Sequence, residues 1–213
     1  MIFMIRNRLS ELLSERGLKI SRVAKEARIA RSSLTSMVQN DSEMIRYDAI
    51  DKLCKLLNVT PNEFFEYSPI IIEYSFDDYP EVNYELQRDV DDKLVLKHFE
   101  FDFLMDVEDS SDKKRFDLEI QFTGFTEDKR THFKVKDEQK TQSLKEIVDQ
   151  LSPGLKNVLY KKLQKELQSY VTRFLLNDIV ENYDDLSSSD IKRLKQAFEK
   201  YPLKLNSNIF TEY

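Results

Sequence analysis

Apolar residues in the first third of the chain recur at the spacing of α-helices. A stripe that starts at Ile5 and continues every three or four residues predicts a helix over residues 5–16. Two short apolar segments, VAKEA and SSLTSMV, border the stretch KEARIARSS and predict two helices joined by a tight turn. Ser21 suits the start of the first of these helices, and Asn40 suits the end of the second.

Two more helices are predicted before residue 67. The first spans residues 48–57, with Cys54 on its apolar side. The second follows in NVTPNEFF, where Thr60 is a suitable N-cap, Pro61 suits the first helical position and Glu63 completes a capping box. Residues 1–67 are therefore predicted to form an all-α domain of five short helices.

After residue 67 the helical spacing gives way to an alternation of apolar and polar residues. This alternation, with enrichment in β-branched and aromatic residues, predicts strands over residues 68–76, 93–105, 115–125 and 131–135. Helical spacing then returns and predicts helices over residues 141–151, from Pro153 to about residue 182, and from Ser189 onward. The predicted class of residues 68–213 is α+β, an antiparallel sheet meander followed by long helices.

Charge is distributed unevenly along the chain, whose formal net charge is −6. Residues 1–40 hold eight Lys and Arg residues and three acidic residues. Residues 68–213 hold 22 Lys and Arg residues and 30 acidic residues. This asymmetry predicts a basic recognition module joined to an acidic body.

Two segments of residues 4–67, KISRVAKEARIARSSLTSMVQN and IDKLCKLLNVTPNEFFEY, resemble the Cro/CI-type (XRE-family) helix-turn-helix domain. The resemblance implies a five-helix fold that binds DNA. The sequence departs from the family at three places: Arg28 stands where the turn usually has glycine, Ala30 replaces a Ser or Thr N-cap, and Val38-Gln39-Asn40 replaces Glu-Asn-Gly. An arginine held at positive φ costs about 1 kcal/mol, which a packed helical core tolerates.

The resemblance also implies which residues contact DNA, because the third helix of this motif enters the major groove. Arg31 is the strongest candidate, since one guanidinium can bond both O6 and N7 of a guanine. The residues expected to face the bases are Arg31, Ser32 and Ser36, with Thr35 and Gln39 at the margin. Those expected to contact phosphates are Lys19, Ser21, Arg22, Arg28 and Arg46.

The composition gives no pattern typical of catalysis or of a metal site. Cys54 and the histidines His98 and His132 lack metal-ligand spacing, and three scattered glycines form no phosphate-binding loop. The neighbouring acids at 77–78, 91–92 and 100/102 are typical of a solvated sheet face. The chain has no Ala-Gly bond of the kind that some phage repressors cleave in themselves. We therefore expect no enzyme activity, no metal and no cofactor.

Membrane insertion and secretion are not expected either. No apolar run approaches the ~18 residues that a membrane span needs. The N-terminal segment MIFMIRNRLS is too short and too soon charged for a signal peptide. A single cysteine excludes an intrachain disulfide, so the expected location is the cytoplasm.

The later helices carry a second, fainter resemblance. SPGLKNVLYKKLQKELQSYVTRF and YPLKLNSNIF, which follow the predicted meander, are similar to segments of the export chaperone SecB and its relatives. This resemblance implies an apolar surface in residues 68–213 that binds peptides or a second copy of the chain.

Together these features favour a sequence-specific DNA-binding transcriptional regulator, a repressor that occludes a promoter as a homodimer on double-stranded DNA. Residues 68–213 would supply dimerisation or sense a protein or peptide partner. Two alternatives remain open. One is an antitoxin with the same DNA-binding domain and a C-terminal domain that neutralises a toxin. The other is a chaperone-like interaction protein that uses its helix-turn-helix for docking.

Overall fold

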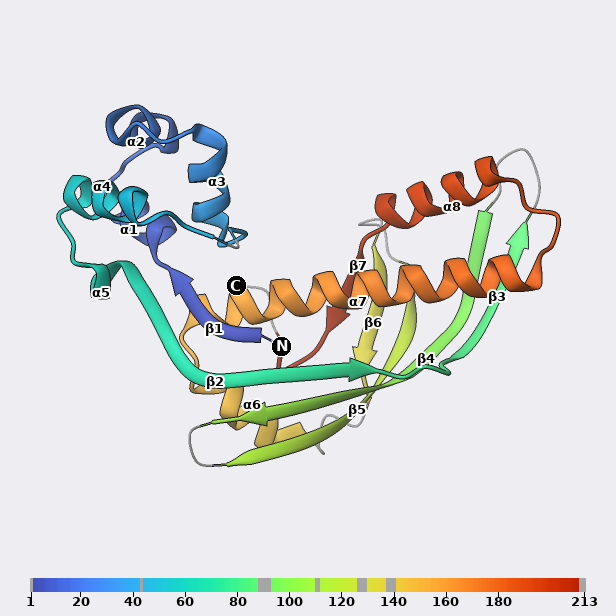
Figure 1. The fold of residues 1–213 in the computed structure, drawn as a ribbon. Coiled ribbons are helices and arrows are strands. Elements are labelled where there is room, and N and C mark those ends of the chain that lie inside the picture. The colour runs from blue at the N-terminus through green and yellow to red at the C-terminus, as the bar shows by residue number, and fades with distance from the viewer. Residues whose placement is uncertain are drawn as a thin grey trace.

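The computed structural model describes residues 2–42, 44–87, 93–109, 112–125, 130–136 and 141–210. A bundle of short helices lies at one end of an elongated molecule, and a curled sheet with one long helix forms the body (Figure 1). Asp91 and Asp92, one of the acidic pairs noted in the sequence, lie outside the described residues.

The bundle consists of five helices that the chain forms one after another. They are α1 (Leu9–Glu15), α2 (Ile20–Ala27), α3 (Arg31–Gln39), α4 (Tyr47–Leu57) and α5 (Pro61–Phe64). Leu9, Leu34 and Phe64 are fully buried in its hydrophobic core. The predicted capping box is confirmed at α5, because Thr60 Oγ1 accepts from Glu63 N and the Glu63 carboxylate accepts from Thr60 N.

The segment before the bundle is a strand, and this overturns the predicted all-α five-helix N-terminal domain. β1 (Ile2–Asn7) pairs antiparallel with β2 (Phe65–Phe76), which starts directly after α5. Helix α1 therefore begins at Leu9 rather than at Ile5, whose side chain is 54% exposed instead of facing the core. In the sequence, the bundle therefore lies between two strands, β1 and β2, that pair with each other.

The sheet is mixed, so the expected antiparallel meander is also corrected. Its remaining strands are β3 (Glu81–Gln87), β4 (Lys93–Glu108), β5 (Lys113–Phe125), β6 (Thr131–Val135) and β7 (Leu203–Asn206). The strand order is β1-β2-β4-β5-β6-β7, and β3 also pairs with β4. β7 runs parallel to β6, because the chain returns to this edge of the sheet only after three further helices.

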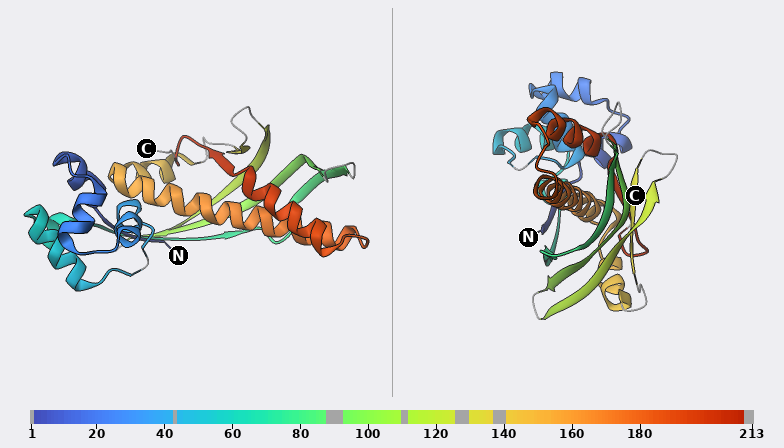
Figure 2. Two further views of the ribbon diagram at one scale, coloured as in Figure 1. Left: turned by 90° about the horizontal axis from the view of Figure 1, so that it is seen from above. Right: turned by 90° about the vertical axis from the view of Figure 1, so that its right-hand side faces the viewer.

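Helix α7 (Pro153–Asn182) lies along the concave face of the sheet (Figure 2). In the chain it follows α6 (Gln142–Asp149) and precedes α8 (Ser188–Lys200). The core between α7 and the sheet is rich in aromatic rings, and Phe76 of β2 stacks on Tyr170 of α7 with centroids 4.7 Å apart. Among the described residues, none of the helices combines the length and the hydropathy that crossing a bilayer requires.

A group of polar side chains joins the bundle to the body. The guanidinium of Arg6 in β1 donates from Nε to Glu66 of β2 and from Nη1 to Glu11 of α1, both at 2.5 Å. The same guanidinium lies against Gly154 in the first turn of α7, where an added Cβ would come within 1.9 Å of Arg6 Cζ. Burial opposes the ionisation of Glu66, but hydrogen bonds from Ser152 and Arg6 outweigh it and lower the pKa of Glu66. We call Arg6, Glu11 and Glu66 the junction cluster.

Candidate nucleic-acid interface

Helices α2 and α3 meet at the tight turn predicted from KEARIARSS. Arg28 ends α2 in the left-handed conformation, with φ 54° and ψ 46°. The following amide, of Ile29, donates to the carbonyl of Ala24 at 3.0 Å and closes the turn. Arginine thus adopts the positive φ that glycine usually supplies, and its side chain is exposed.

Helix α3 has one buried side and one exposed side. Leu34 and Met37 are buried in the bundle core. With about 100° per residue, Ser32, Ser36 and Gln39 lie on the side opposite Leu34, and Ser32 and Gln39 are exposed. These residues therefore share the face that a helix would present to the major groove, and their assignment as base contacts stays a prediction.

Arg31 and Thr35 lie beside this face. Arg31 is the first residue of α3 and is exposed. The Thr35 hydroxyl donates to the carbonyl of Arg31 at 2.9 Å. This back-bond occupies the hydroxyl hydrogen, so the methyl group of Thr35 is the part best placed to contact a base.

Two of the residues predicted to contact phosphate already have acidic partners. Arg22 Nε lies 2.7 Å from Glu26 Oε1, one helical turn along α2. Arg46 Nε lies 2.8 Å from Asp48 Oδ1 at the start of α4. Both arginines are exposed, and ion pairs of this kind contribute little to stability. A phosphate can therefore replace either carboxylate at low cost.

Three other basic residues of the predicted contact set differ from these two arginines in their ion pairing. In the part of the chain that the structure describes, Lys19, Arg28 and Arg31 make no ion pair, and all three are exposed. They mark the start of α2, the turn and the start of α3. The prediction that Ser21 is the N-cap of α2 is wrong, because the helix already begins at Ile20 and Lys19 is its cap residue.

The end of α3 is fastened to β1 by two asparagines. Asn40 ends the helix in the left-handed conformation, as predicted, and its Oδ1 accepts from Asn7 N at 2.8 Å while its Nδ2 donates to Asn7 O at 3.1 Å. Asn7 Nδ2 donates in turn to the carbonyl of Met37 at 2.8 Å. Sequence reasoning missed Asn7, because nothing local indicates a partner 33 residues later in the chain.

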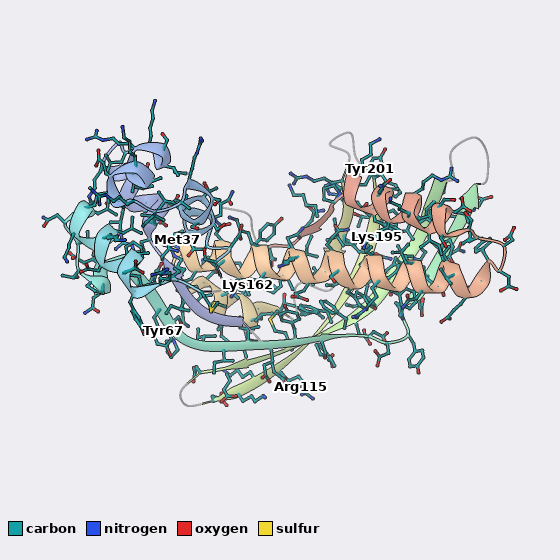
Figure 3. The ribbon with its side chains drawn as sticks, turned by 45° about the horizontal axis from the view of Figure 1, so that its top comes forward. Met37, Tyr67, Arg115, Lys162, Lys195 and Tyr201 are labelled. Carbon is teal, nitrogen blue, oxygen red and sulfur yellow. The ribbon has the colours of Figure 1, made fainter. Side chains whose placement is uncertain are left out.

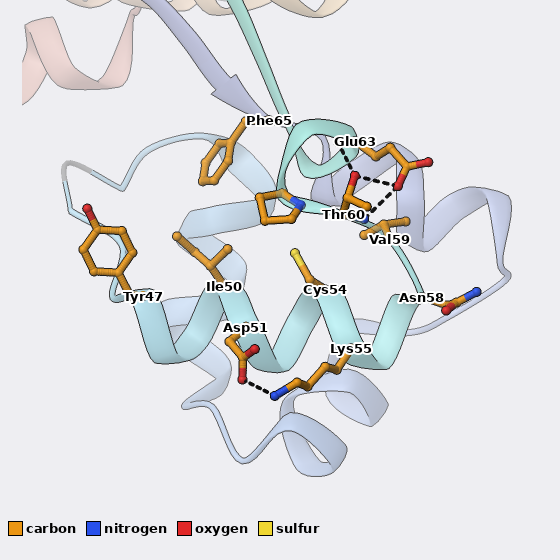
Figure 4. Close-up of a pocket in the computed structure, with 11 residues that line it drawn as sticks. Tyr47, Ile50, Asp51, Cys54, Lys55, Asn58, Val59, Thr60, Glu63 and Phe65 are labelled. Atoms are coloured by element: carbon orange, nitrogen blue, oxygen red, sulfur yellow. Dashed lines mark hydrogen bonds and ion pairs between the residues drawn. The ribbon is translucent and has the colours of Figure 1, made fainter.

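A hollow of about 690 Å³ lies on the α4–α5 side of the bundle (Figure 4). Ile50, Val59 and Phe65 line it together with Cys54. Cys54 belongs to the bundle core, as predicted, and burial raises the pKa of its thiol, which disfavours the thiolate. Among the described residues, no three His, Cys, Asp or Glu side chains gather in a way that could hold a metal ion.

Comparison with known proteins identifies one segment of the chain. Residues 8–69 match the family model of the Cro/C1-type helix-turn-helix DNA-binding domain. The match begins after β1 and includes the whole bundle and the first residues of β2. No curated protein and no solved structure matches the chain.

Proposed function

We propose that this chain, in which residues 8–69 form an XRE-family helix-turn-helix domain, is a transcriptional repressor that binds a specific DNA site as a homodimer. It acts by occupying a promoter, with no catalytic step. The observation that carries the proposal is the exposed side of α3 bordered by the uncompensated charges of Lys19, Arg28 and Arg31. The domain match supports a DNA-binding regulator independently of that geometry.

Sequence is recognised by α3 in the major groove. Arg31 donates two hydrogen bonds to O6 and N7 of a guanine, a pairing that discriminates between bases by about 1–3 kcal/mol. Ser32, Ser36 and Gln39 contact the neighbouring base edges from the exposed side of the helix. Lys19, at the start of α2, binds a backbone phosphate and adds affinity without sequence preference.

Two copies are needed because one chain presents a single α3. Two recognition helices contact half-sites about 34 Å apart, one turn of the double helix, when a two-fold axis relates the proteins. Both half-site contacts then contribute to the binding free energy and to its sequence dependence, while each half-site stays short.

The experiment is selection of bound sites from a random DNA pool, followed by binding measurements on the selected site. Arg31→Ala is expected to weaken binding to that site by about 1–3 kcal/mol and to affect random DNA much less. Lys19→Ala is expected to weaken binding to both DNAs and to lower the slope of affinity against salt by about 1.

Lys25→Ala is the matched control, because Lys25 is another exposed lysine of α2 that lies outside the predicted contact set. Equal losses on both DNAs for Arg31→Ala would contradict the base-recognition role. A wild-type protein that selects no site, or that binds its site only as a monomer, would contradict the proposed function.

A further inference from the structure

Helix α7 carries an unexpected concentration of positive charge. Residues 156–173 hold five Lys and Arg residues and one acidic residue, although residues 68–213 as a whole are strongly acidic. Lys161, Lys162 and Lys165 are all exposed. With about 100° per residue, the three fall within about 100° of one another on the solvent side of the helix. We call these three residues the α7 lysine row.

The α7 lysine row has no acidic partner in the described part of the chain. Lys156, one turn nearer the start of the helix, shows the contrast, because its ammonium lies 2.9 Å from Asp149. Partial burial lowers the pKa of Lys162, and no carboxylate offsets this effect. An anion from outside the chain would do so.

The row lies on the helix whose first turn adjoins β1, to which the end of α3 is bonded. The end of α3 is bonded to Asn7 of β1, and the neighbouring residue Arg6 lies against Gly154 of α7. Lys165 follows Gly154 by eleven residues, about 16 Å along the helix. Figure 1 shows α3 and α8 on the same side of α7, with the bundle at one end of α7 and α8 nearer the other end.

Helix α8 adds positive charge on the far side of the row. Lys195 and Lys200 are exposed, and neither makes an ion pair in the described part of the chain. Figure 3 shows Lys162 on α7 between the bundle and α8, with Lys195 and Tyr201 on the α8 side. Two elements of the body, α7 and α8, thus carry exposed cations in addition to those of α2 and α3.

We propose that the α7 lysine row binds the phosphate backbone of the same DNA duplex whose major groove receives α3. Lys195 and Lys200 extend this contact. The proposal rests on the proposed function, because it requires α3 to lie in DNA. A line of unpaired ammonium groups suits a duplex, whose backbone carries about one charge per 1.7 Å of axis, and lysine binds phosphate without selecting a base.

The test compares wild type with the triple variant K161Q/K162Q/K165Q on the site selected by wild type and on random DNA of the same length. Each phosphate contact contributes about 0.9 to the slope of log affinity against log salt concentration. The triple variant is therefore expected to lose about 2–3 in slope. The loss should be equal on both DNAs, whereas Arg31→Ala affects mainly the specific site.

The matched control is K113Q/K114Q/K134Q, which removes three charges from β5 and β6 and should leave the slope unchanged. Hydroxyl-radical footprinting adds a second measure: the triple row variant should lose protection of backbone next to the α3 half-site and keep protection within it. If the triple variant does not fold, the single variant Lys162→Gln is used, with an expected slope change of about 1.

The outcomes separate this inference from the proposed function. An unchanged salt slope in a row variant that still binds the selected site overturns the inference alone. The inference also fails if the variant keeps its slope but changes its mass in solution, because the row would then contact a second protein chain. A wild-type protein that binds no DNA overturns both.

Discussion

Three residues other than glycine have a left-handed backbone in the described chain, namely Arg28, Asn40 and Asn58. Each ends a helix of the bundle, and the amide that follows bonds to a carbonyl five residues earlier. Asparagine adopts this conformation readily, but a long side chain does so only at a cost. Local strain in the bundle is therefore concentrated at Arg28, in the turn before α3.

Replacing Arg28 by glycine should relieve this strain. We expect Arg28→Gly to stabilise the protein against urea by up to about 1 kcal/mol, because glycine occupies positive φ without a Cβ clash. Asn58→Gly is the control and should give a smaller gain, since asparagine at that position is little strained. A loss of stability in Arg28→Gly would show that the arginine side chain contributes more than its backbone costs.

At the scale of single residues, the predictions of the α5 capping box and of Asn40 as the end of α3 are confirmed. The capping box at Thr60 and Glu63 needs only residues three apart, and Asn40 needs only its own tolerance of positive φ. The prediction that Ser21 caps α2 is wrong for a local reason as well, because Ile20 already continues the helical pattern and the helix starts before the serine. The bonds of Asn7 to Asn40 and of Arg6 to Glu66 could not be predicted, since these partners are remote in sequence.

Among elements, helices with long apolar stripes were predicted well and short strands were not. The predicted limits of α7 coincide with those observed, because its stripe is long and Ser152 and Pro153 mark its start. β1 was mistaken for the start of a helix, since a short apolar run has the same appearance in both structures. Its partner β2 lies beyond five helices, and β7 reaches its partner β6 only after three.

The pairing of β4 with β5 gives a pH-dependent contribution to stability. Arg115 of β5 lies directly opposite Asp106 of β4, and its Nε and Nη2 donate to the two carboxylate oxygens at 2.7 and 2.9 Å. These bonds lower the pKa of Asp106 to about 2. The folded form of Asp106 therefore binds its proton less readily than the unfolded form, and the contribution is present above the unfolded pKa.

We expect Arg115→Gln to destabilise the protein most above pH 4 and progressively less as the pH falls toward 2, where Asp106 becomes protonated in both proteins. Urea unfolding midpoints across this range test the trend, and the carboxyl resonance of Asp106 should titrate at higher pH in the variant. Lys114→Gln is the control, because Lys114 has only a 3.7 Å pair with Asp112. A pH-independent effect of Arg115→Gln would contradict the linkage.

At the scale of the whole molecule, two hydrophobic cores meet at the junction cluster. One core fills the bundle and the other lies between the sheet and α7. Arg6 is the shared element, since it bonds Glu66 at the start of β2 and Glu11 in the bundle and rests on the first turn of α7. Sequence pattern could define each core separately, but not the docking of one on the other.

Removing the charge of Arg6 should uncouple the two cores. We expect wild type to unfold in one calorimetric transition and Arg6→Gln to unfold in two, with a loss of about 1–3 kcal/mol because two carboxylates lose a largely buried partner. Arg8→Gln is the control, since among the described residues the Arg8 guanidinium makes a single hydrogen bond, to the Glu63 carbonyl at 3.4 Å. One transition at an unchanged temperature for Arg6→Gln would mean that β1 and β2 suffice to couple the cores.

The pairing of Asn7 with Phe65 means that the bundle is attached to the body at both of its ends and not through a single linker. A domain on one flexible linker changes its orientation and can reach half-sites at several separations. A bundle attached at both ends keeps its orientation relative to the body. In the proposed homodimer, the distance between the two copies of α3 would then be set by how the two bodies associate and not by the reach of a linker. We therefore expect the proposed homodimer to tolerate little change in half-site spacing, so that a selected site with a few base pairs inserted at its centre should bind more weakly.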